Sequence, residues 1–242
     1  PMNRLPKVTV ITVCRNALPL LRHTVENVLQ QTYAPLEYLI IDGASTDGTP
    51  AYLSSLQAPL QWWSEPDKGI YDAMNKGAAR ATGEWVIFMN AGDCFAATHV
   101  LQRIFSTPRT ADVIYGDVLK ATADGAPVLS RAHPFKNAHR MCFCHQSSLA
   151  RIACLRATPF DINHPFSADF KFFKLLGLQG KTFAYVDFPI ALFDTGGISN
   201  RQRSKGLYDN IKVVNETDSF LERLRLLPRL WFVYLLCRLR GK

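Results

Sequence analysis

Acids, amides, lysines and glycines are concentrated in the segment 64–77, which reads Ser-Glu-Pro-Asp-Lys-Gly-Ile-Tyr-Asp-Ala-Met-Asn-Lys-Gly. A short apolar run from Trp85 to Met89 follows it, and Asp93 lies just beyond the carboxyl end of that candidate strand. In open α/β sheets, ligands bind in the crevice outside the carboxyl ends of the strands. An acid in that place, with no residue nearby that obviously neutralises it, indicates a metal or a cationic ligand. We therefore expect an enzyme that handles a charged small molecule.

A second acid, Asp42, follows the apolar run 36–41 and precedes a turn-forming segment that begins at Gly43. A carboxylate at this position can accept hydrogen bonds from a nucleobase N–H or a ribose hydroxyl. A local alternative is that Ser45 or Asp47 only caps the next helix. Both interpretations can hold at once, because Asp42 lies outside the capping residues.

Asp93 closes the sequence Asn90-Ala91-Gly92-Asp93. A hard divalent cation prefers carboxylate oxygens and commonly bridges phosphates, and Gly92 would let the backbone approach a diphosphate closely. Asn, Gly and Asp also favour ordinary turns, which is the simpler explanation of these residues. The position at the end of a strand favours the metal site.

Strands and helices alternate between residues 7 and about 115. This pattern predicts βαβ units and a mainly parallel sheet flanked by helices, that is, a Rossmann-like α/β fold. The expected strands are 8–13, 36–41, 60–63 and 85–89, and the expected helices are 20–31, 49–56 and 71–81. The later part is less regular, with a strand pair at 112–119 around Gly116, a turn at 125–127, a helix at 166–176, a strand at 182–186, a loop at 196–199 and helical structure after 213.

Composition limits the class of protein. The 242 residues are 48% hydrophobic and 20% charged, as in a globular protein of one large domain or one domain with an appendage. The net charge of +8 favours anionic partners. Nucleic acid is disfavoured because the excess charge gathers near the end of the chain and does not alternate with aromatic residues over a sheet face. The six cysteines show no paired Cys-x-x-Cys spacing, which favours reduced thiols in a reducing compartment.

No segment has the 18 or so consecutive apolar residues that crossing a bilayer requires, and the first residues enter a strand without a signal-peptide pattern. The segment from Phe220 to Lys242 mixes arginines with aromatic and aliphatic residues. Such a basic amphipathic helix suits the surface of an anionic membrane. A helix packed on the domain and an oligomer contact are the alternatives, and the charge beside the apolar run 230–237 favours the membrane surface.

Taken together, these motifs resemble family 2 glycosyltransferases of the GT-A fold, in particular bacterial exopolysaccharide enzymes such as those of colanic acid assembly. The resemblance covers about residues 7 to 205. It is carried by Val-Ile-Thr-Val at 10–13, Ile-Ile-Asp-Gly-Ala-Ser-Thr-Asp-Gly-Thr at 40–49, the segment 64–77, Asn-Ala-Gly-Asp at 90–93, His-Gln-Ser-Ser at 145–148, Ala-Asp-Phe at 168–170 and Gly-Gly-Ile-Ser at 196–199.

The resemblance implies inverting transfer from a nucleotide-diphosphate sugar with the help of Mg²⁺ or Mn²⁺. The acceptor would be a hydroxyl of a lipid-linked oligosaccharide, at the cytoplasmic face of the bacterial plasma membrane. Asp169 would be the catalytic base and Asp93 the metal ligand. The implied donor-binding residues are Thr12, Arg15, Asp42, Asp67 and Lys76, and the implied acceptor or diphosphate contacts are His145, Gln146, Gly196 and Gly197.

The chain departs from the family pattern at the metal site, because it contains no Asp-x-Asp. Asn90 stands near the place of the first acid, so a second ligand would come from elsewhere, with His145 as the candidate. The expected organisation is a glycosyltransferase domain over 1–210, with a nucleotide-sugar half at about 7–115 and an acceptor half at about 116–210, followed by the basic helical tail 211–242. Oligomerisation is possible.

Two other functions fit part of the pattern. A nucleotidyltransferase also uses an α/β sheet and a metal, but its Gly-rich loop should follow the first strand, where this chain has Cys14-Arg15-Asn16-Ala17. A non-catalytic nucleotide-sugar sensor or membrane adaptor is compatible with the altered metal motif.

Overall fold

The computed structural model describes residues 4–122, 125–194, 196 and 202–240. Its strands form one sheet in the order β3-β2-β1-β4-β8-β6-β9-β5, with β7 paired to β6. The strands are β1 (Val8–Cys14), β2 (Leu36–Asp42), β3 (Gln61–Ser64), β4 (Trp85–Phe88), β5 (Cys94–Phe95), β6 (Val113–Lys120), β7 (Val128–Ser130), β8 (Ser148–Arg151) and β9 (Phe183–Phe193). The helices are α1 (Leu18–Leu29), α2 (Thr49–Ser55), α3 (Ile70–Arg80), α4 (Val100–Ile104), the 3₁₀ turn η1 (His145–Ser147), α5 (Ile152–Ala157), α6 (Ala168–Leu178), α8 (Arg203–Thr217) and α9 (Phe220–Leu239).

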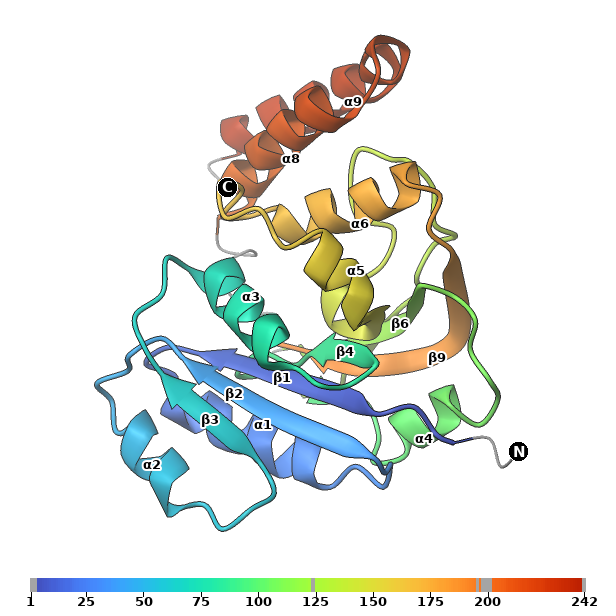
Figure 1. The fold of residues 1–242 in the computed structure, drawn as a ribbon. Coiled ribbons are helices and arrows are strands. Elements are labelled where there is room, and N and C mark those ends of the chain that lie inside the picture. The colour runs from blue at the N-terminus through green and yellow to red at the C-terminus, as the bar shows by residue number, and fades with distance from the viewer. Residues whose placement is uncertain (1–3, 123–124, 195, 197–201, 241–242) are drawn as a thin grey trace.

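The first part of the sheet is parallel and buried on both faces. β1 pairs in parallel with β2 and β4, and β2 pairs in parallel with β3. Alternate residues of β1 enter two separate cores: Val8 and Val10 pack with α1, whereas Ile11 and Val13 pack with α3 and α6. Figure 1 shows α1, α2 and α4 on one face of the sheet and α3, α5 and α6 on the other. Strands buried on both faces explain the unbroken apolar runs of the sequence.

Beyond β4 the sheet contains antiparallel pairs. β8 is antiparallel to both β4 and β6, and β5 is antiparallel to β9, whereas β6 and β9 are parallel. The predicted α/β fold with helices on both faces of a mainly parallel sheet is confirmed, because β6 and β9 run in the same direction as β1 to β4. β8 enters between β4 and β6 from the opposite direction, without a helical crossover.

Two strands differ from their predictions. The expected strand pair around Gly116 is one continuous strand, β6. β9 continues well past the predicted end at Val186, although Asp187 and Pro189 interrupt its apolar run. The β6–β9 register shifts beside Gly116 and Asp117, and this irregularity accommodates the proline within the pairing. The longer β9 brings Asp194 to the end of the strand.

The last two helices form a hairpin that packs on α6 (Figure 1). Its core joins Phe170 of α6 to Val214 of α8 and Leu230 of α9. α9 begins at a Ser219 cap, whose hydroxyl accepts a hydrogen bond from the Glu222 N–H. The expected boundary after residue 210 falls inside α8. Among the described residues, no helix combines the length and apolar character that crossing a membrane requires.

Candidate active site

The parallel strands end at one edge of the sheet, and Asp42 closes β2 there. Its side chain is fully buried. The carboxylate accepts hydrogen bonds from the Ser45 N–H (3.0 Å), the Ser45 hydroxyl and the Ser64 hydroxyl (2.6 Å). Asp42 therefore organises the two loops around it. Ser45 does not cap α2, whose N-cap is Gly48; Asp47 instead accepts a hydrogen bond from the Thr49 N–H at the start of that helix.

Arg15 and Asp67 meet over Gly43, beside Asp42. A Cβ atom at Gly43 would lie 2.3 Å from Asp67 Oδ2 and 3.3 Å from Arg15 Cβ, so a larger residue there would displace the Asp67 carboxylate. Arg15 is exposed and Asp67 is half-buried, and the second oxygen of Asp67 accepts the Gly69 N–H at 2.9 Å. This pair presents a cation and an acid at the open edge of the sheet.

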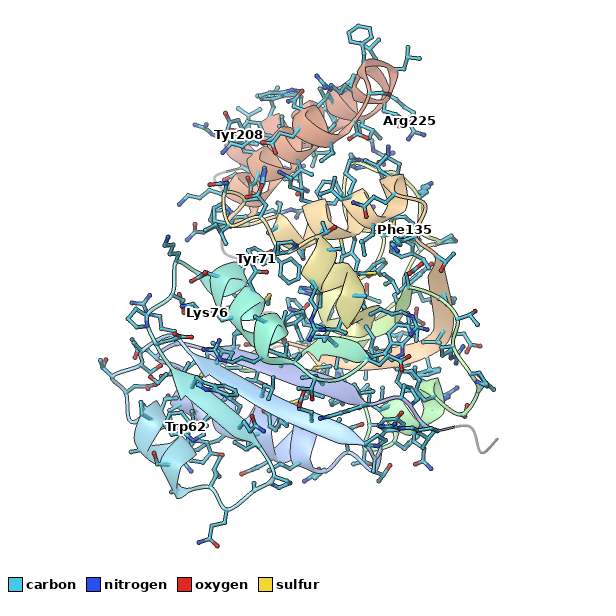
Figure 2. All side chains as sticks on the ribbon, in the orientation of Figure 1. Trp62, Tyr71, Lys76, Phe135, Tyr208 and Arg225 are labelled. Carbon is cyan, nitrogen blue, oxygen red and sulfur yellow. The ribbon has the colours of Figure 1, made fainter. Side chains whose placement is uncertain are left out.

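Thr12 and Lys76 are placed differently. Thr12 is fully buried, and its hydroxyl lies 3.0 Å from the hydroxyl of Tyr38 within the core, so it does not reach the open edge. Lys76 on α3 donates to the Pro66 carbonyl at 2.6 Å and lies 3.4 Å from Asp72. Figure 2 shows Lys76 on the side of the molecule where α3 begins. In this conformation Lys76 holds the loop that precedes α3.

A pair of acids lies where β4 and β9 end. Asp93 Oδ1 accepts the backbone N–H of Asp194 at 3.0 Å, and the Asp194 carboxylate lies against Gly92, which has φ of +104°. Gln146 also hydrogen-bonds the Asp93 side chain. Burial, together with the nearby negative charge of Asp194, raises the pKa of Asp93 to about 7. Two carboxylates held this close repel each other unless a proton or a cation intervenes.

The residues of this turn fit a divalent cation. Asn90, which lies between the end of β4 and Asp93, has a buried side-chain oxygen without a hydrogen-bond partner among the described residues. Asp93, Asp194 and Asn90 thus offer only oxygen donors, which hard cations prefer. The predicted second ligand was His145, but that side chain lies beside Asp169 instead. Asp194 is the acid that replaces it near Asp93.

Asp169 lies in the first turn of α6, and a fifth of its side chain is exposed. Its Oδ1 atom accepts a 2.8 Å hydrogen bond from the Tyr71 hydroxyl. Its Oδ2 atom lies 3.9 Å from Nδ1 of His145. One oxygen of Asp169 is thus held by a buried phenol, while the other faces an imidazole without a direct hydrogen bond.

His145 and Gln146 are neighbours on η1, and they reach different acids. Gln146 contacts Asp93, and His145 faces Asp169. The His145 ring is enclosed by Phe88, Phe160 and Phe173. Burial lowers the pKa of His145, although the negative charge of Asp169 opposes this shift. The imidazole is therefore neutral near pH 7, and η1 connects the two acidic groups.

The glycines at 196 and 197 follow β9. The Gly196 N–H donates to Asp194 Oδ1 at 2.9 Å, so Gly196 positions the second acid of the pair. Gly197 lies outside the described residues. A contact of Gly196 with an acceptor or a diphosphate stays a prediction.

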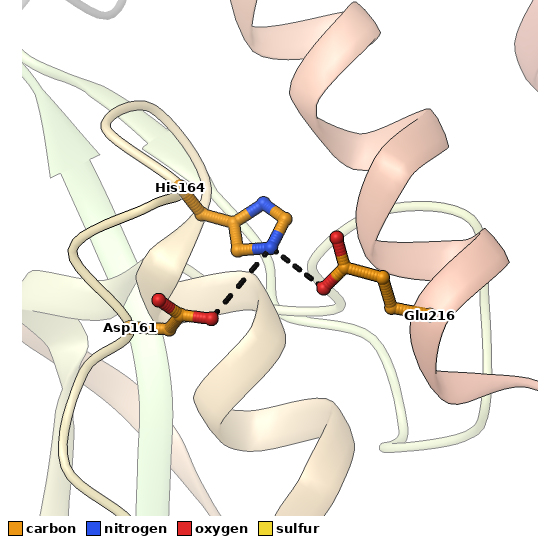
Figure 3. A group of neighbouring side chains, drawn as sticks. All are labelled: Asp161, His164 and Glu216. Atoms are coloured by element: carbon orange, nitrogen blue, oxygen red, sulfur yellow. Dashed lines mark hydrogen bonds and ion pairs between the residues drawn. The ribbon is translucent and has the colours of Figure 1, made fainter.

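A separate group of Asp161, His164 and Glu216 joins the start of α6 to α8 (Figure 3). The Lys171 ammonium lies 2.6 Å from both Asp161 and Glu216, and His164 is also 3.0 Å from Asp209. A cation of the protein itself already lies between these acids. The group is an ion-pair network that fastens the C-terminal hairpin to the domain.

Sequence reasoning missed two residues of the site, Asp194 and Tyr71. Asp194 directly follows a strand and precedes glycines, and Asp42 likewise closes a strand before Gly43, so the same signal was present in the sequence. It was overlooked because β9 was expected to end at Val186. Tyr71 stands within the segment 64–77, but nothing in that segment indicates that its hydroxyl reaches α6.

The comparison with protein families agrees with the fold. The family model for glycosyl transferase family 2 matches residues 9–163. The chain belongs to glycosyl transferase family 2. It is 42% identical over 102 residues to an uncharacterised glycosyltransferase of Mycobacterium tuberculosis, across 41% of this chain and 39% of that protein. It is 27% identical over 209 residues to a PGL/p-HBAD biosynthesis glycosyltransferase of Mycobacterium bovis, across 81% and 80%.

Solved structures show the same fold. The mannosyltransferase PcManGT from Pyrobaculum calidifontis, in complex with GDP-Man and Mn²⁺, superimposes with a TM-score of 0.70 at 17% identity and covers 90% of this chain and 66% of that one. TarS of S. aureus in complex with UDP gives 0.67 at 15% identity, across 88% and 67%. The predicted GT-A fold is confirmed by these likenesses.

Proposed function

We propose that this protein transfers a sugar from a nucleotide-diphosphate sugar to a hydroxyl group, with inversion at the anomeric carbon. The observation that carries the proposal is the arrangement around η1. A partly exposed carboxylate, Asp169, lies on one side of this turn, and the acid pair Asp93–Asp194 lies on the other. Sugar transfer requires a base for the acceptor and a charged site for the diphosphate.

Asp169 is the proposed base. It would accept the proton of the attacking hydroxyl through Oδ2, because Oδ1 is held by Tyr71. The hydrogen bond from Tyr71 fixes the orientation of the carboxylate. Because the neighbouring imidazole of His145 is neutral, it forms no ion pair with Oδ2, and this oxygen stays available to the attacking hydroxyl.

Asp93, Asp194 and Asn90 are the proposed ligands of a divalent cation, Mg²⁺ or Mn²⁺. When bound, such a cation neutralises the negative charge of the departing nucleoside diphosphate. The support is the oxygen-only donor set, the unpartnered oxygen of Asn90 and the repulsion between the two acids. PcManGT, which has the same fold, was solved with GDP-Man and Mn²⁺.

Arg15 and Asp67 are the proposed contacts for the nucleoside, since both lie at the open edge over Gly43. Asp42 would support this site from beneath. For Lys76 to contact the diphosphate, it would have to leave the Pro66 carbonyl. The proposed acceptor is a lipid-linked oligosaccharide of cell-surface polysaccharide synthesis, such as an exopolysaccharide of the colanic acid type.

The proposed location is the inner face of the bacterial plasma membrane, with α9 against the lipid. The support is the outer side of α9, where large apolar side chains are exposed: Phe232 at 63% and Leu239 at 83%. The same segment also carries five arginines: Arg223, Arg225, Arg229, Arg238 and Arg240. Apolar side chains beside basic ones bind anionic membrane surfaces.

Release of nucleoside diphosphate tests the transferase. The purified protein is mixed with UDP- and GDP-sugars in the presence of Mn²⁺, and free UDP or GDP is measured. Slow hydrolysis, stopped by a chelator and by Asp93→Ala, is the expected result. If the protein bound a nucleotide sugar but did not turn it over, with or without an added acceptor, it would be a sensor or adaptor, and the proposed transferase activity would be wrong.

Sedimentation with anionic liposomes tests the location. Phe232→Ser/Leu235→Ser should reduce binding strongly, whereas the control Leu129→Ser, at an exposed position on β7, should not. Salt should weaken but not abolish binding, because only the electrostatic part is screened. If the wild-type protein did not sediment with these liposomes, the proposed location would be wrong.

A further inference from the structure

Two cavities follow the segment 130–144, which connects β7 to η1. One, of about 460 Å³, begins beside the acids of the candidate active site, where Cys144 and Phe193 line it. The Cys144 sulfur lies 3.1 Å from the Gln146 side-chain oxygen, and Phe193 directly precedes Asp194. The other, of about 480 Å³, extends to α9, where Arg225 and Arg229 line it.

The two cavities share His133, Arg140, Met141 and Cys142 in their linings. They therefore form one groove that leads from the acids of the site to the C-terminal hairpin. Figure 2 labels Arg225 at the hairpin, on the side where α6 ends and away from Tyr71. We call this groove the basic groove, because its charged lining residues are all cationic: Lys120, Arg131, Lys136, Arg140, Arg225 and Arg229.

Most of these cations have no acidic partner. Among the residues that the structure describes, Lys120, Lys136, Arg140 and Arg229 form no ion pair. Arg225 pairs with Glu222 at 2.5 Å, and Arg131 lies 3.8 Å from Asp117. Burial, together with the positive charges of Arg229 and Arg140, lowers the pKa of His139 in the same groove. Like charges gathered without counter-ions favour an anionic ligand.

The groove is held in shape from beneath by Asn137. Its side-chain amide donates to Asp218 at 2.7 Å and accepts from Lys174 of α6, and Arg225 donates to its backbone carbonyl at 3.0 Å. Lys174 and Asp218 form a buried ion pair of 2.7 Å. The loop that carries Lys136 and Arg140 is therefore fixed against α6 and α9, and the cations stand on a rigid support.

The far end of the basic groove continues into apolar surface. On a helix, residues three or four apart lie on one face, so Arg225, Arg229, Phe232 and Leu236 share a face of α9. Phe232 and Leu236 are both exposed. A ligand would thus meet apolar side chains at one end, cations in the middle and the acids of the candidate active site at the other end.

We propose that the basic groove binds the diphosphate of a lipid-diphosphate-linked acceptor, with the lipid along Phe232 and Leu236 and the saccharide directed toward Asp169. This inference rests on the proposed function and identifies the chemical class of its acceptor. Guanidinium groups suit this role because they form paired hydrogen bonds with phosphate oxygens. The order of the surfaces matches the order of the three parts of such a molecule.

Binding of geranyl diphosphate to the full chain tests the proposal. Calorimetric titration is done in EDTA, so that a metal-dependent diphosphate site does not contribute. Arg140→Gln/Arg229→Gln should weaken binding about 10- to 100-fold, as expected for the loss of two charge-assisted contacts. The matched control Arg238→Gln/Arg240→Gln removes the same charge from α9 outside the groove and should change the affinity less than about twofold, within the range of exposed charges.

Two further ligands separate the possible sources of the anion. Inorganic pyrophosphate should bind more weakly than geranyl diphosphate, because it lacks the apolar part; equal affinities would overturn the lipid assignment. Tighter binding of an oligosaccharide of glucuronic acid than of geranyl diphosphate would assign the groove to a carboxylated glycan and overturn the proposal. Equal affinities of the groove variant and its control would also overturn it.

Measuring the release of nucleoside diphosphate on the same preparation tests the proposed function separately from this inference. Geranyl diphosphate binding without donor hydrolysis would overturn the transferase while leaving a diphosphate-binding groove. Donor hydrolysis without geranyl diphosphate binding would overturn the groove and leave the transferase.

Discussion

The acids in the two parts of the sheet differ in their hydrogen-bond partners. In the parallel part, Asp42 is buried and receives hydrogen bonds from Ser45 and Ser64, and Glu37 receives them from Lys7, Thr9 and Thr82. In the part around η1, Asp93 lies against a second acid, Asp194. The oxygen of Asn90 in the same region is buried without a partner among the described residues.

This difference distinguishes acids that stabilise the fold from groups that are available to bind ligands. Buried polar groups that are fully hydrogen-bonded stabilise and fix a fold, whereas partly satisfied ones cost free energy. Asp42 and Glu37 of the parallel part are hydrogen-bonded without a ligand. The region around η1 contains unsatisfied groups that a cation, a diphosphate and an acceptor hydroxyl would satisfy. Substitutions in the first part should therefore reduce stability, and those in the second should reduce activity.

The largest expected effect is that of Asp169→Asn on turnover. Loss of a general base lowers the rate by about 10²- to 10⁴-fold. Affinity for the donor should change little, because Asp169 lies across η1 from Asp93. Transfer to an acceptor is measured by product formation, and donor affinity by titration.

The matched control is Asp187→Asn, an exposed acid on β9, which should transfer normally. A near-normal rate for Asp169→Asn would remove it from the role of base. Equal losses of donor affinity and rate would instead place Asp169 in the donor site.

Asp42→Ala should act on stability, with a loss of about 2–4 kcal/mol in the free energy of unfolding. The reason is that the N–H and hydroxyl of the buried Ser45 would be left without an acceptor, and the Ser64 hydroxyl would lose the same partner. Urea denaturation measures the loss, with Asp187→Ala as the control. Unchanged stability combined with lost donor affinity would show that the Asp42 carboxylate serves the nucleoside and not the fold.

The sequence predicts the parallel part well because periodicity and strand ends carry the information there. Unbroken apolar runs indicate strands buried on both faces, and Asp42 follows such a run directly. The expected strands at 8–13 and 36–41 each differ from the structure by one residue. The likeness of the motifs to family 2 glycosyltransferases correctly indicated the family.

The part around η1 depends on contacts between distant segments, which local patterns do not encode. Tyr71 and Asp169 are 98 residues apart in the chain, and Asp93 and Asp194 are 101 apart. β9 contains Pro189, which normally argues against a strand interior, and the shifted register with β6 that accommodates it is invisible in sequence. The second acid of the pair was missed for this reason.

A smaller effect, about 2 kcal/mol at pH 7, is expected for Glu37→Gln. Burial of the Glu37 carboxyl opposes its ionisation, but hydrogen bonds from Thr82, Thr9 and Lys7 outweigh burial and lower its pKa to about 2. A lowered pKa in the folded state stabilises the fold above the unfolded pKa, near 4.5, and this contribution is lost as the pH falls toward 2.

Urea denaturation of the wild-type protein and Glu37→Gln at several pH values measures this dependence. The difference in stability should be constant above about pH 5 and should shrink between pH 4.5 and pH 2. If the two proteins differed in stability by the same amount at pH 3 and pH 7, the cost of Glu37→Gln would come from altered packing and not from the lost charge. Glu37 would then not be an ionised link between β1 and β2.

The smallest effect, about 1 kcal/mol, should have the opposite sign. Asp194→Asn removes the repulsion between two neighbouring carboxylates and keeps an oxygen that can accept the Gly196 N–H. The metal-free protein should therefore become more stable, as is common where active-site groups are replaced. At the same time Mn²⁺ should raise the melting temperature less than it does for the wild type, because one anionic oxygen ligand is lost. Thermal unfolding with and without Mn²⁺ measures both changes, with Asp187→Asn as the control for the removal of one negative charge. If Asp194→Asn were less stable than the wild type and Mn²⁺ raised its melting temperature as much, Asp194 would stabilise the fold as Asp42 does. The contrast between the two parts of the sheet would then fail, because Asp194 and Asp93 are the acids on which it depends.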